Sequence, residues 1–169
     1  ISGLMVGRTP EFMGKKIEAR EMKIAMIIAL LHPFLILVGT ALAAAMPQYT
    51  AATVTNPGFH GFSQMLYEYT SSAANNGSGF EGLGDNTLWW NISTGFVLIL
   101  GRFLPIIGPL AIAGLLAEKK FIPESNGTLK TDTSTFGLMV FTVIAIIAAL
   151  AFFPVLALGP IAEYFSMLK

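Results

Sequence analysis

The chain has no cysteine and very little charge. Only 12% of its 169 residues are Asp, Glu, Lys or Arg, and the formal net charge is zero. A soluble domain carries about 25% charged residues, so much of the usual charge is missing. The absence of cysteine excludes disulfides, thiolate chemistry and cysteine metal sites. A zero net charge gives no reason to expect nucleic acid as a partner. The two histidines, His32 and His60, are too few and too far apart for a histidine metal cluster.

Apolar residues dominate what is present, at 54% of the chain with a mean hydropathy of +0.68. The first long apolar segment, Ile24 to Ala45, would span about 33 Å as a helix, which is enough for the hydrocarbon core. A second runs from about Asn91 to Ala117. A third, Phe136 to Leu158, carries no charge, and Gly159-Pro160 is expected to end it. We therefore predict an all-α integral membrane protein with three spanning helices.

The distribution of basic residues predicts the orientation. Basic side chains precede the first helix and lie between the second and third, at Arg8, Lys15, Lys16, Arg20, Lys23, Lys119, Lys120 and Lys130. The connection from Met46 to Trp90 contains no Lys or Arg. The positive-inside rule therefore predicts two cytoplasmic loops, with this connection and the C-terminus outside. Trp89, Trp90 and Tyr49 are expected in the outer aromatic belt.

The chain opens on an apolar stretch, Ile1 to Val6, that runs directly into the first basic loop. It lacks the layout of a signal peptide. We interpret it as the tail of an upstream transmembrane helix, and the chain as a piece of a larger membrane protein.

The most unusual stretch is the polar, glycine-rich run from Ser71 to Gly84, between apolar segments. Such backbone cannot face lipid and is tolerated only where protein buries it or where it lines an aqueous cavity. Residues 61–74, which lead into this run, carry apolar side chains at helical spacing. A helix of that length is about 20 Å long, too short to span the bilayer. We predict a membrane–pore–membrane repeat with spanning helices 24–46 and 91–117, a re-entrant pore helix 61–74 and a filter 75–80.

The expected filter residues are Asn75, Asn76, Gly77 and Ser78, flanked by Gly79, Phe80 and Glu81. Dehydrating a potassium ion requires a ring of oxygens, which backbone carbonyls can supply, here those of Asn76 and Gly77. Glycine admits positive φ and leaves the axis free of side chains. One such loop offers a quarter of a filter. The alternative is an ordinary flexible outer loop. The run Gly77 to Gly82 also matches a dinucleotide fingerprint, but without the strand and βαβ unit that this motif requires.

Arg102 lies near the bilayer midplane of the second helix. A charge there costs about 2.5–3.5 kcal/mol on insertion scales, so it is not expected to face lipid. It either supplies a fixed positive charge beneath the filter or pairs with a carboxylate or with carbonyls freed by Pro105 and Pro109. His32-Pro33 is interpreted as a helix kink with a structural histidine, and Arg8 as a snorkelling interfacial residue.

Two carboxylates lie near the expected mouth of the filter. Glu68 on the pore helix and Glu81 after the filter could raise the local cation concentration. The alternative for both is solvated charge on the outer surface.

Five segments resemble one family, the bacterial potassium-transporting ATPase potassium-binding subunits, KdpA, and together they follow nearly the whole chain in order. They are residues 7–23 (GRTPEFMGKKIEAREMK), 56–63 (NPGFHGFS), 73–78 (AANNGS), 101–103 (GRF) and 157–164 (ALGPIAEY). The resemblance implies a member of the superfamily of potassium transporters with four membrane–pore–membrane repeats. Residues 1–23 would end the third repeat and form a cytoplasmic loop, 24–117 the fourth repeat, 118–135 a cytoplasmic loop, and 136–169 a final helix and outer tail.

The resemblance also implies roles for individual residues. Asn75 to Ser78 would form the fourth quadrant of the filter, with Gly77 as its key glycine, and Arg102 and Arg8 would be the positive charges on its cytoplasmic side. Gly79, and Ala74 before only two asparagines, depart from the family pattern.

The partners that the resemblance implies are the other three pore repeats, the P-type ATPase subunit KdpB, KdpC, a small single-helix subunit and the lipid of the bacterial inner membrane. The chain would bind potassium and no nucleotide, and ATP hydrolysis would take place in KdpB. The alternatives are a passive potassium channel, an ion-coupled transporter and, more weakly, a structural membrane anchor.

Overall fold

The computed structural model describes residues 11–56, 58–123 and 132–168, with the side chains of 150–160, 162, 163 and 166 left out. The expectations for Ile1 to Val6, Arg8 and Lys130 lie outside these residues. The chain forms two compact units, Ile1–Ile122 and Pro123–Lys169, each of which is described by itself.

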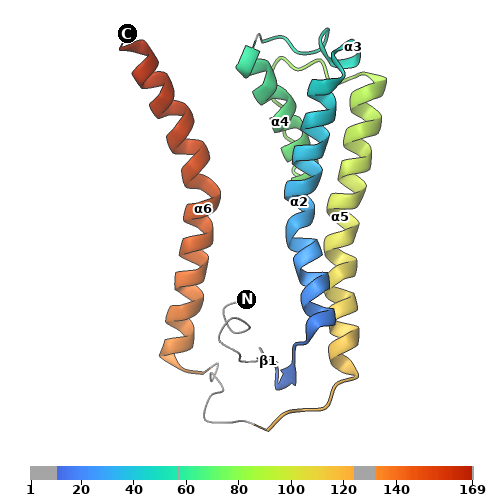
Figure 1. Cartoon of the computed structure of the whole chain (residues 1–169), viewed down its shortest axis with the longest axis vertical. Helices are drawn as coiled ribbons and strands as arrows, with labels where there is room; N and C mark the ends of the chain where they lie inside the picture. The colour runs from blue at the N-terminus through green and yellow to red at the C-terminus, as the bar shows by residue number, and fades with distance from the viewer. Residues whose placement is uncertain (1–10, 57, 124–131, 169) are drawn as a thin grey trace. The chain divides into compact units, whose positions relative to one another are not determined.

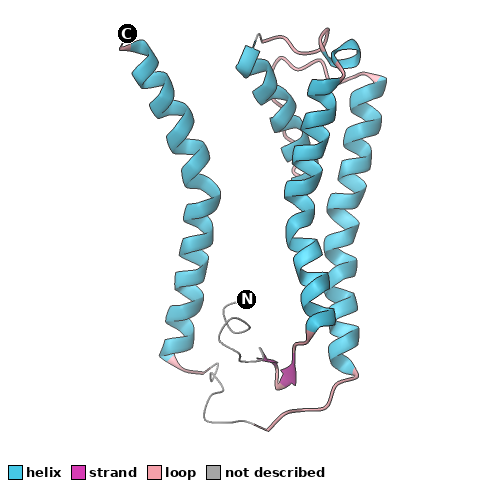
Figure 2. Ribbon diagram, viewed as in Figure 1, coloured by secondary structure: helices cyan, strands magenta, loops and turns pink. Residues whose placement is uncertain are grey.

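The first unit is built from three main helices, α2 (Ala19–Ala45), α4 (Gly58–Ala74) and α5 (Leu88–Ala117) (Figure 1). A single turn of helix, α3 (Pro47–Thr50), connects α2 to α4. Before α2, two-residue strands β1 (Glu11–Phe12) and β2 (Lys15–Lys16) form an antiparallel hairpin, the only sheet among the described residues (Figure 2). This hairpin is the one feature that the all-α prediction omits.

Among the described residues, two helices are long and apolar enough to cross a membrane by length and composition, namely α2 and α5. Both begin before their apolar runs because polar residues cap them. Glu18 and Glu21 form a reciprocal capping box at the start of α2. At the start of α5, the Thr87 hydroxyl accepts from the backbone N–H of Trp90 at 3.5 Å. The predicted starts at Ile24 and Asn91 are therefore a few residues late.

The second unit contains α6 (Ser134–Met167). The prediction that Gly159-Pro160 ends this helix is wrong, because α6 continues to Met167. Proline removes one backbone hydrogen bond, and a long apolar helix can absorb that loss without stopping. Within the described side chains, the apolar part of α6 is the shorter stretch Ser134–Ala149. A third spanning helix therefore stays a prediction.

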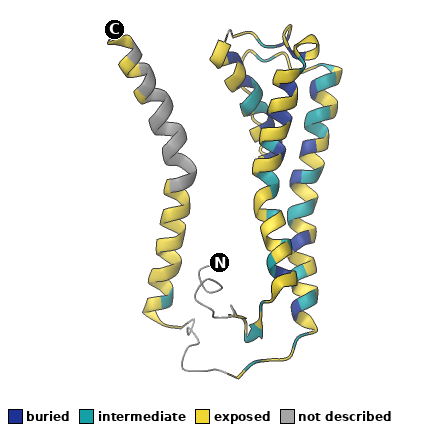
Figure 3. Ribbon diagram, viewed as in Figure 1, coloured by how far each residue is buried: buried dark blue, intermediate teal, exposed yellow. Residues whose placement is uncertain are grey.

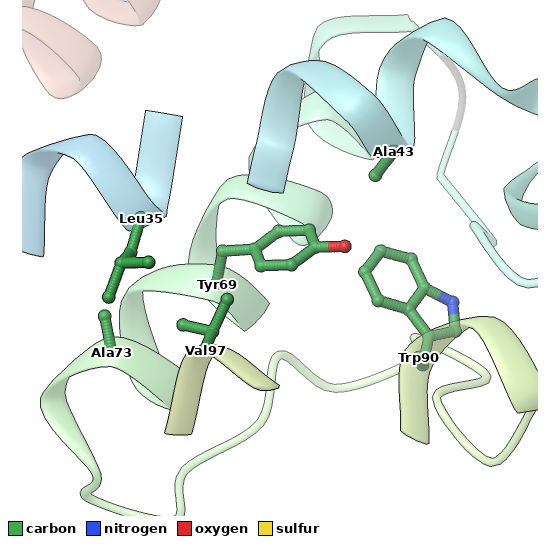
Figure 4. Close-up of a cluster of buried hydrophobic side chains, with 6 residues drawn as sticks. All are labelled: Leu35, Ala43, Tyr69, Ala73, Trp90 and Val97. Carbon is green, nitrogen blue, oxygen red and sulfur yellow. The ribbon is translucent and has the colours of Figure 1, made fainter. Parts of the chain in front are cut away.

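The core of the first unit lies where α4 packs against both α2 and α5. Its buried apolar residues are Leu35, Ala43, Tyr69, Ala73, Trp90 and Val97 (Figure 4). Buried positions gather on the facing sides of these three helices (Figure 3). The Tyr69 ring lies over the bare backbone of Gly39, where a Cβ atom would overlap it. Trp90 and Tyr69 are the largest fully buried side chains of this core, and their ring centroids lie 5.7 Å apart.

Trp90 corrects one expectation. Its side chain is only 1% exposed and its Nε1–H donates to the Thr53 hydroxyl at 2.9 Å, so it is a core residue and not part of an outer aromatic belt. Tyr49 and Trp89, by contrast, stack face to face with ring centroids 5.4 Å apart at the same end of the unit.

Candidate functional site

The candidate site lies where the chain turns back after α4. This helix starts at the end of the unit where α2 ends and α5 begins, and it stops part-way along them (Figure 1). Residues 75–87, here called the returning segment, lead back to the start of α5. Near its far end, Gly84 N–H donates to the Thr53 carbonyl at 2.8 Å, beside the loop that follows α2.

The depth of the turn follows from its contact with α5. The side-chain amide of Asn75 donates to the Leu98 carbonyl at 3.3 Å. Leu98 lies about 15 Å along α5 from Leu88, at about 1.5 Å per residue. The chain therefore enters beside the helices, turns well inside their length and leaves by the same end. A re-entrant pore loop within a membrane stays a prediction.

Asn75 forms the turn itself. Its φ of 57° lies in the left-handed region, where asparagine is among the favoured residues. Its Nδ2 lies within 3.1 Å of the Ser72 carbonyl and 3.2 Å of the Ala73 carbonyl. Both carbonyls belong to the last turn of α4, where the regular helical donors run out, and the Ser72 carbonyl also accepts from the Asn75 backbone N–H at 3.1 Å. Asn75 is thus the C-terminal cap of α4.

The next residues are braced against α4 by side chains. The Ser71 hydroxyl lies 2.7 Å from Asn76 Oδ1 and also contacts the Ser78 carbonyl. Asn76 Oδ1 in turn accepts from the Ser78 backbone N–H at 3.0 Å. Ser78 Oγ lies 2.9 Å from the Tyr67 hydroxyl. The Ser78 carbonyl therefore faces α4. In this respect it differs from the carbonyls of Asn76 and Gly77.

The carbonyls of Asn76 and Gly77 differ from that of Ser78. Within the described residues, no hydrogen bond ends on either oxygen. Gly77 has a φ of 75°, and a Cβ placed on it would have no atom within 4 Å. Two free carbonyl oxygens on bare backbone thus follow the C-terminal end of α4, whose dipole is negative there. The two oxygens of this arrangement can accept a cation.

Arg102 is attached directly to this turn. Its Nε donates to Asn75 Oδ1 at 2.9 Å. Among the described residues, the hydrogen-bond partner of Arg102 is the neutral amide of Asn75, and neither a carboxylate nor a proline-freed carbonyl. An amide carries no charge, so this partner does not neutralise the guanidinium beside the turn. A positive charge beneath a filter stays a prediction.

The carbonyl freed by Pro105 has a different partner. Proline has no N–H, so the carbonyl four residues earlier, at Gly101, loses its helical donor. His32 on α2 places its Nε2 3.1 Å from this oxygen. Because a carbonyl only accepts, the proton must reside on Nε2. His32 thus contacts the helix turn that carries Arg102, a role that the sequence interpretation missed. The sequence signal that could have found it is Pro105, because its missing N–H leaves the Gly101 carbonyl without a helical donor.

Gly101 also fixes how closely α4 approaches α5. A Cβ on Gly101 would lie 2.6 Å from the Ala73 carbonyl oxygen, well inside contact distance. Only glycine lets the end of α4 lie directly on α5 at this point.

The outer part of the returning segment is attached through Gln64, which is fully buried. Its Oε1 accepts from Asn56 N–H at 3.2 Å, and its Nε2 donates to Thr55 Oγ1 at 3.1 Å and to the Glu81 carbonyl at 3.4 Å. Phe80 packs edge-on against the Tyr67 ring, with centroids 5.6 Å apart. Nothing in the sequence distinguished Gln64 from a surface residue of α4.

The carboxylates near this end have different surroundings. Glu81 is exposed, as solvated charge would be. Glu68 is partly buried on α4, and burial raises the pKa of its carboxyl, with the nearby charge of Asp85 raising it further.

At the opposite end of the unit, an ion cluster joins the start of α2 to the residues after α5. Lys119 Nζ lies 2.9 Å from the buried Glu21 carboxylate and 3.2 Å from that of Glu18. Burial alone would lower the pKa of Lys119, but its hydrogen bonds to Glu21 and Glu18 raise it. Lys15 donates to the last carbonyls of α5, at 2.8 Å to Leu116. Two lysines counted only as loop charges therefore tie the helix ends together.

The family described as potassium-transporting ATPase A subunit, KdpA, matches residues 1–165. The chain belongs to this family. The resemblance seen in five short segments is thereby confirmed, and with α2 and α5 it makes the chain part of a mostly helical membrane protein.

Individual relatives carry the same name, potassium-transporting ATPase potassium-binding subunit. The chain is 71% identical to the protein of Flavobacterium johnsoniae and 72% identical to that of Flavobacterium psychrophilum, over 99% of this chain and 31% of each relative. It is 60% identical to the protein of Geobacillus kaustophilus, over 99% of this chain and 30% of that relative. The chain thus spans about a third of the length of the curated relatives it matches.

Proposed function

We propose that this chain supplies one quarter of a potassium-selectivity filter in the potassium-binding subunit of an ATP-driven uptake system. The observation that carries the proposal is the pair of free carbonyls at Asn76 and Gly77, at the bottom of a re-entrant turn. Carbonyl oxygens at close quarters can replace the hydration shell of potassium. The negative end of α4 favours a cation at the same place. Ser78 attaches the turn to α4 through Ser71 and Tyr67. Gly79, Phe80 and Glu81 then lead the chain back outward.

Arg102 supplies the second part of the proposal. Its charge lies on the α5 side of the turn, about 20 Å along that helix from Leu88. A fixed positive charge beneath a filter opposes straight passage of a cation. The ion is then selected here and diverted sideways to a partner that drives uptake. Arg8, in the residues before α2, would play the same part for the preceding repeat. A passive channel or an ion-coupled transporter remains the alternative, and Arg102 counts against the freely conducting form.

The remaining assignments concern the rest of the complex. Since the chain spans about a third of its relatives, three further pore repeats would come from elsewhere in the same polypeptide. The printed name of the relatives, an ATPase subunit that binds potassium, supports ATP hydrolysis in a partner chain. We assign that hydrolysis to KdpB, with KdpC and a small single-helix subunit completing the assembly. The complex would lie in the bacterial inner membrane with the mouth of the filter and the C-terminus outside.

The test is potassium-dependent ATP hydrolysis by the whole complex, with Gly77→Ala compared with Gly79→Ala. At Gly77 an alanine must adopt a φ of 75°, which costs about 1–2 kcal/mol and shifts the carbonyls. A loss of 1.4 kcal/mol in ion binding corresponds to about a tenfold change in affinity. Gly79 has open space and no positive φ, so it is the matched control.

We expect the potassium concentration for half-maximal hydrolysis to rise about tenfold in Gly77→Ala and to change little in Gly79→Ala. An unchanged value for Gly77→Ala would remove this residue from the filter. Potassium uptake by the complex that continues without ATP would favour the passive or ion-coupled alternative.

A further inference from the structure

Helix α5 contains an acceptor that its own backbone cannot satisfy. Pro105 has no N–H, so the Gly101 carbonyl has no donor one turn later. Freed carbonyls of this kind are where membrane helices bend or shift, unless a neighbouring side chain satisfies them. The neighbour here is His32 on α2, whose Nε2 lies 3.1 Å from the Gly101 oxygen.

The hydrogen bond between His32 and Gly101 lies next to Arg102 on α5. Gly101 immediately precedes Arg102, and its bare Cα faces the Ala73 carbonyl at the end of α4. The same helix turn is therefore held from α4 by close packing and from α2 by a hydrogen bond. From that turn Arg102 reaches Asn75 at 2.9 Å. A small rotation or shift of α5 at Gly101 would move Nε out of hydrogen-bond range.

We propose that His32 is a positioning residue for Arg102. As the Nε2–H donor to the Gly101 carbonyl, it fixes the turn of α5 from which the arginine reaches the expected filter. The inference rests on the proposed function, since a positioning role has meaning only if Arg102 acts on the ion. The role requires only that Nε2 carries a proton, and it involves no proton transfer.

The experiment uses the full-length protein in its assembled complex, reconstituted into potassium-loaded vesicles. Two quantities are measured for each variant, the potassium moved per ATP hydrolysed and the potassium leak without ATP. Arg102→Gln sets the scale of the effect. His32→Leu removes the donor at similar volume, and His32→Gln keeps a donor near the Nε2 position. His60→Leu, at the exposed second histidine near the start of α4, is the matched control.

We expect His32→Leu to change both quantities in the same direction as Arg102→Gln, by several-fold, with His32→Gln restoring most of the wild-type behaviour and His60→Leu leaving it unaltered. A purely structural histidine would lower thermal stability and yield without changing the potassium moved per ATP.

A second variant tests the contact independently of folding. Pro105→Ala returns the missing N–H to the Gly101 carbonyl, so His32→Leu should lose most of its effect in that background. The positioning role is overturned if Arg102→Gln alters coupling and His32→Leu does not, or if His32→Leu acts equally with and without Pro105. An Arg102→Gln variant with wild-type coupling and leak would overturn the Arg102 part of the proposed function and the role of His32 with it, while the filter assignment is decided separately by Gly77→Ala.

Discussion

The Nε of Arg102 donates to Oδ1 of Asn75 at 2.9 Å, while the amide nitrogen of the same Asn75 contacts the carbonyls that end α4. One short side chain thus closes the helix and holds the arginine. The turn and the positive charge are therefore joined by a direct hydrogen bond. This coupling gives Asn75 more weight than its place at the edge of the expected filter indicated.

Replacing Asn75 should separate its backbone role from its side-chain role. Asn75→Ala loses the side-chain bonds and must still adopt a φ of 57°, which costs about 1–2 kcal/mol for a residue with a Cβ. Asn75→Gly loses the same bonds without that strain. We expect both variants to be destabilised, Asn75→Ala by about 1 kcal/mol more, in thermal unfolding of the purified complex. Equal stabilities would mean that the turn relaxes to another conformation.

The contact between α4 and α5 can be tested through glycine. Gly101→Ala would place a Cβ 2.6 Å from the Ala73 oxygen, so α4 must move away. Such overpacking costs about 1–3 kcal/mol, and it should also weaken the hydrogen bond between Arg102 and Asn75. Gly114→Ala is the control on the same helix, because its Cβ would meet nothing within 4 Å. It should be neutral or stabilising by up to about 1 kcal/mol. The reverse order in thermal unfolding would contradict close packing at Gly101.

The sequence predicted a mostly helical membrane protein, for a physical reason. A polar glycine-rich run between apolar helices has few permitted conformations in a membrane, so composition and length predict a short helix followed by a turn at residues 75–80. The pore repeat itself stays a prediction. Helix α2 and helix α5 followed from their apolar runs in the same way. What these patterns fix is where the chain must turn.

The side-chain contacts could not be predicted, because they depend on which faces meet. From the sequence, Trp90 resembles an interfacial aromatic residue, but in the structure its indole N–H donates to the Thr53 hydroxyl. Gln64 looks like a surface polar residue, yet it is fully buried. The partner of Arg102 lies 27 positions away on another element. Periodicity assigns a residue to a face of its own helix and carries no information on its partner.

Glu68 predicts a pH dependence of stability. Burial and the charge of Asp85 raise the pKa of its carboxyl above the ordinary 4.5. A carboxyl whose pKa is raised on folding stabilises the folded state in its neutral form. That contribution is complete below about pH 4.5 and is lost as the pH rises through the folded-state pKa. At pH 7 we therefore expect Glu68→Gln to unfold at a higher temperature than the wild type, with the difference vanishing toward pH 4.5.

Asp85→Asn provides the control for this titration. It removes the second cause of the raised pKa and leaves the first. It should therefore shift the stability curve in the same direction as Glu68→Gln, but by less. A wild type and a Glu68→Gln variant that stay parallel across this pH range would show that Glu68 titrates normally.

The ion cluster at the opposite end should behave as a coupled pair. Lys119→Met leaves the buried Glu21 carboxylate without its cation, so we expect a clear loss of stability. Glu21→Gln removes the charge but keeps a polar side chain of the same size, and combining it with Lys119→Met should cost less than the sum of the two single changes. Lys120→Met, at the exposed neighbouring lysine, is the control and should have little effect. Additive losses in thermal unfolding would show that Lys119 stabilises the helix ends through Glu18 at 3.2 Å or the Lys16 carbonyl at 3.0 Å, and not through Glu21.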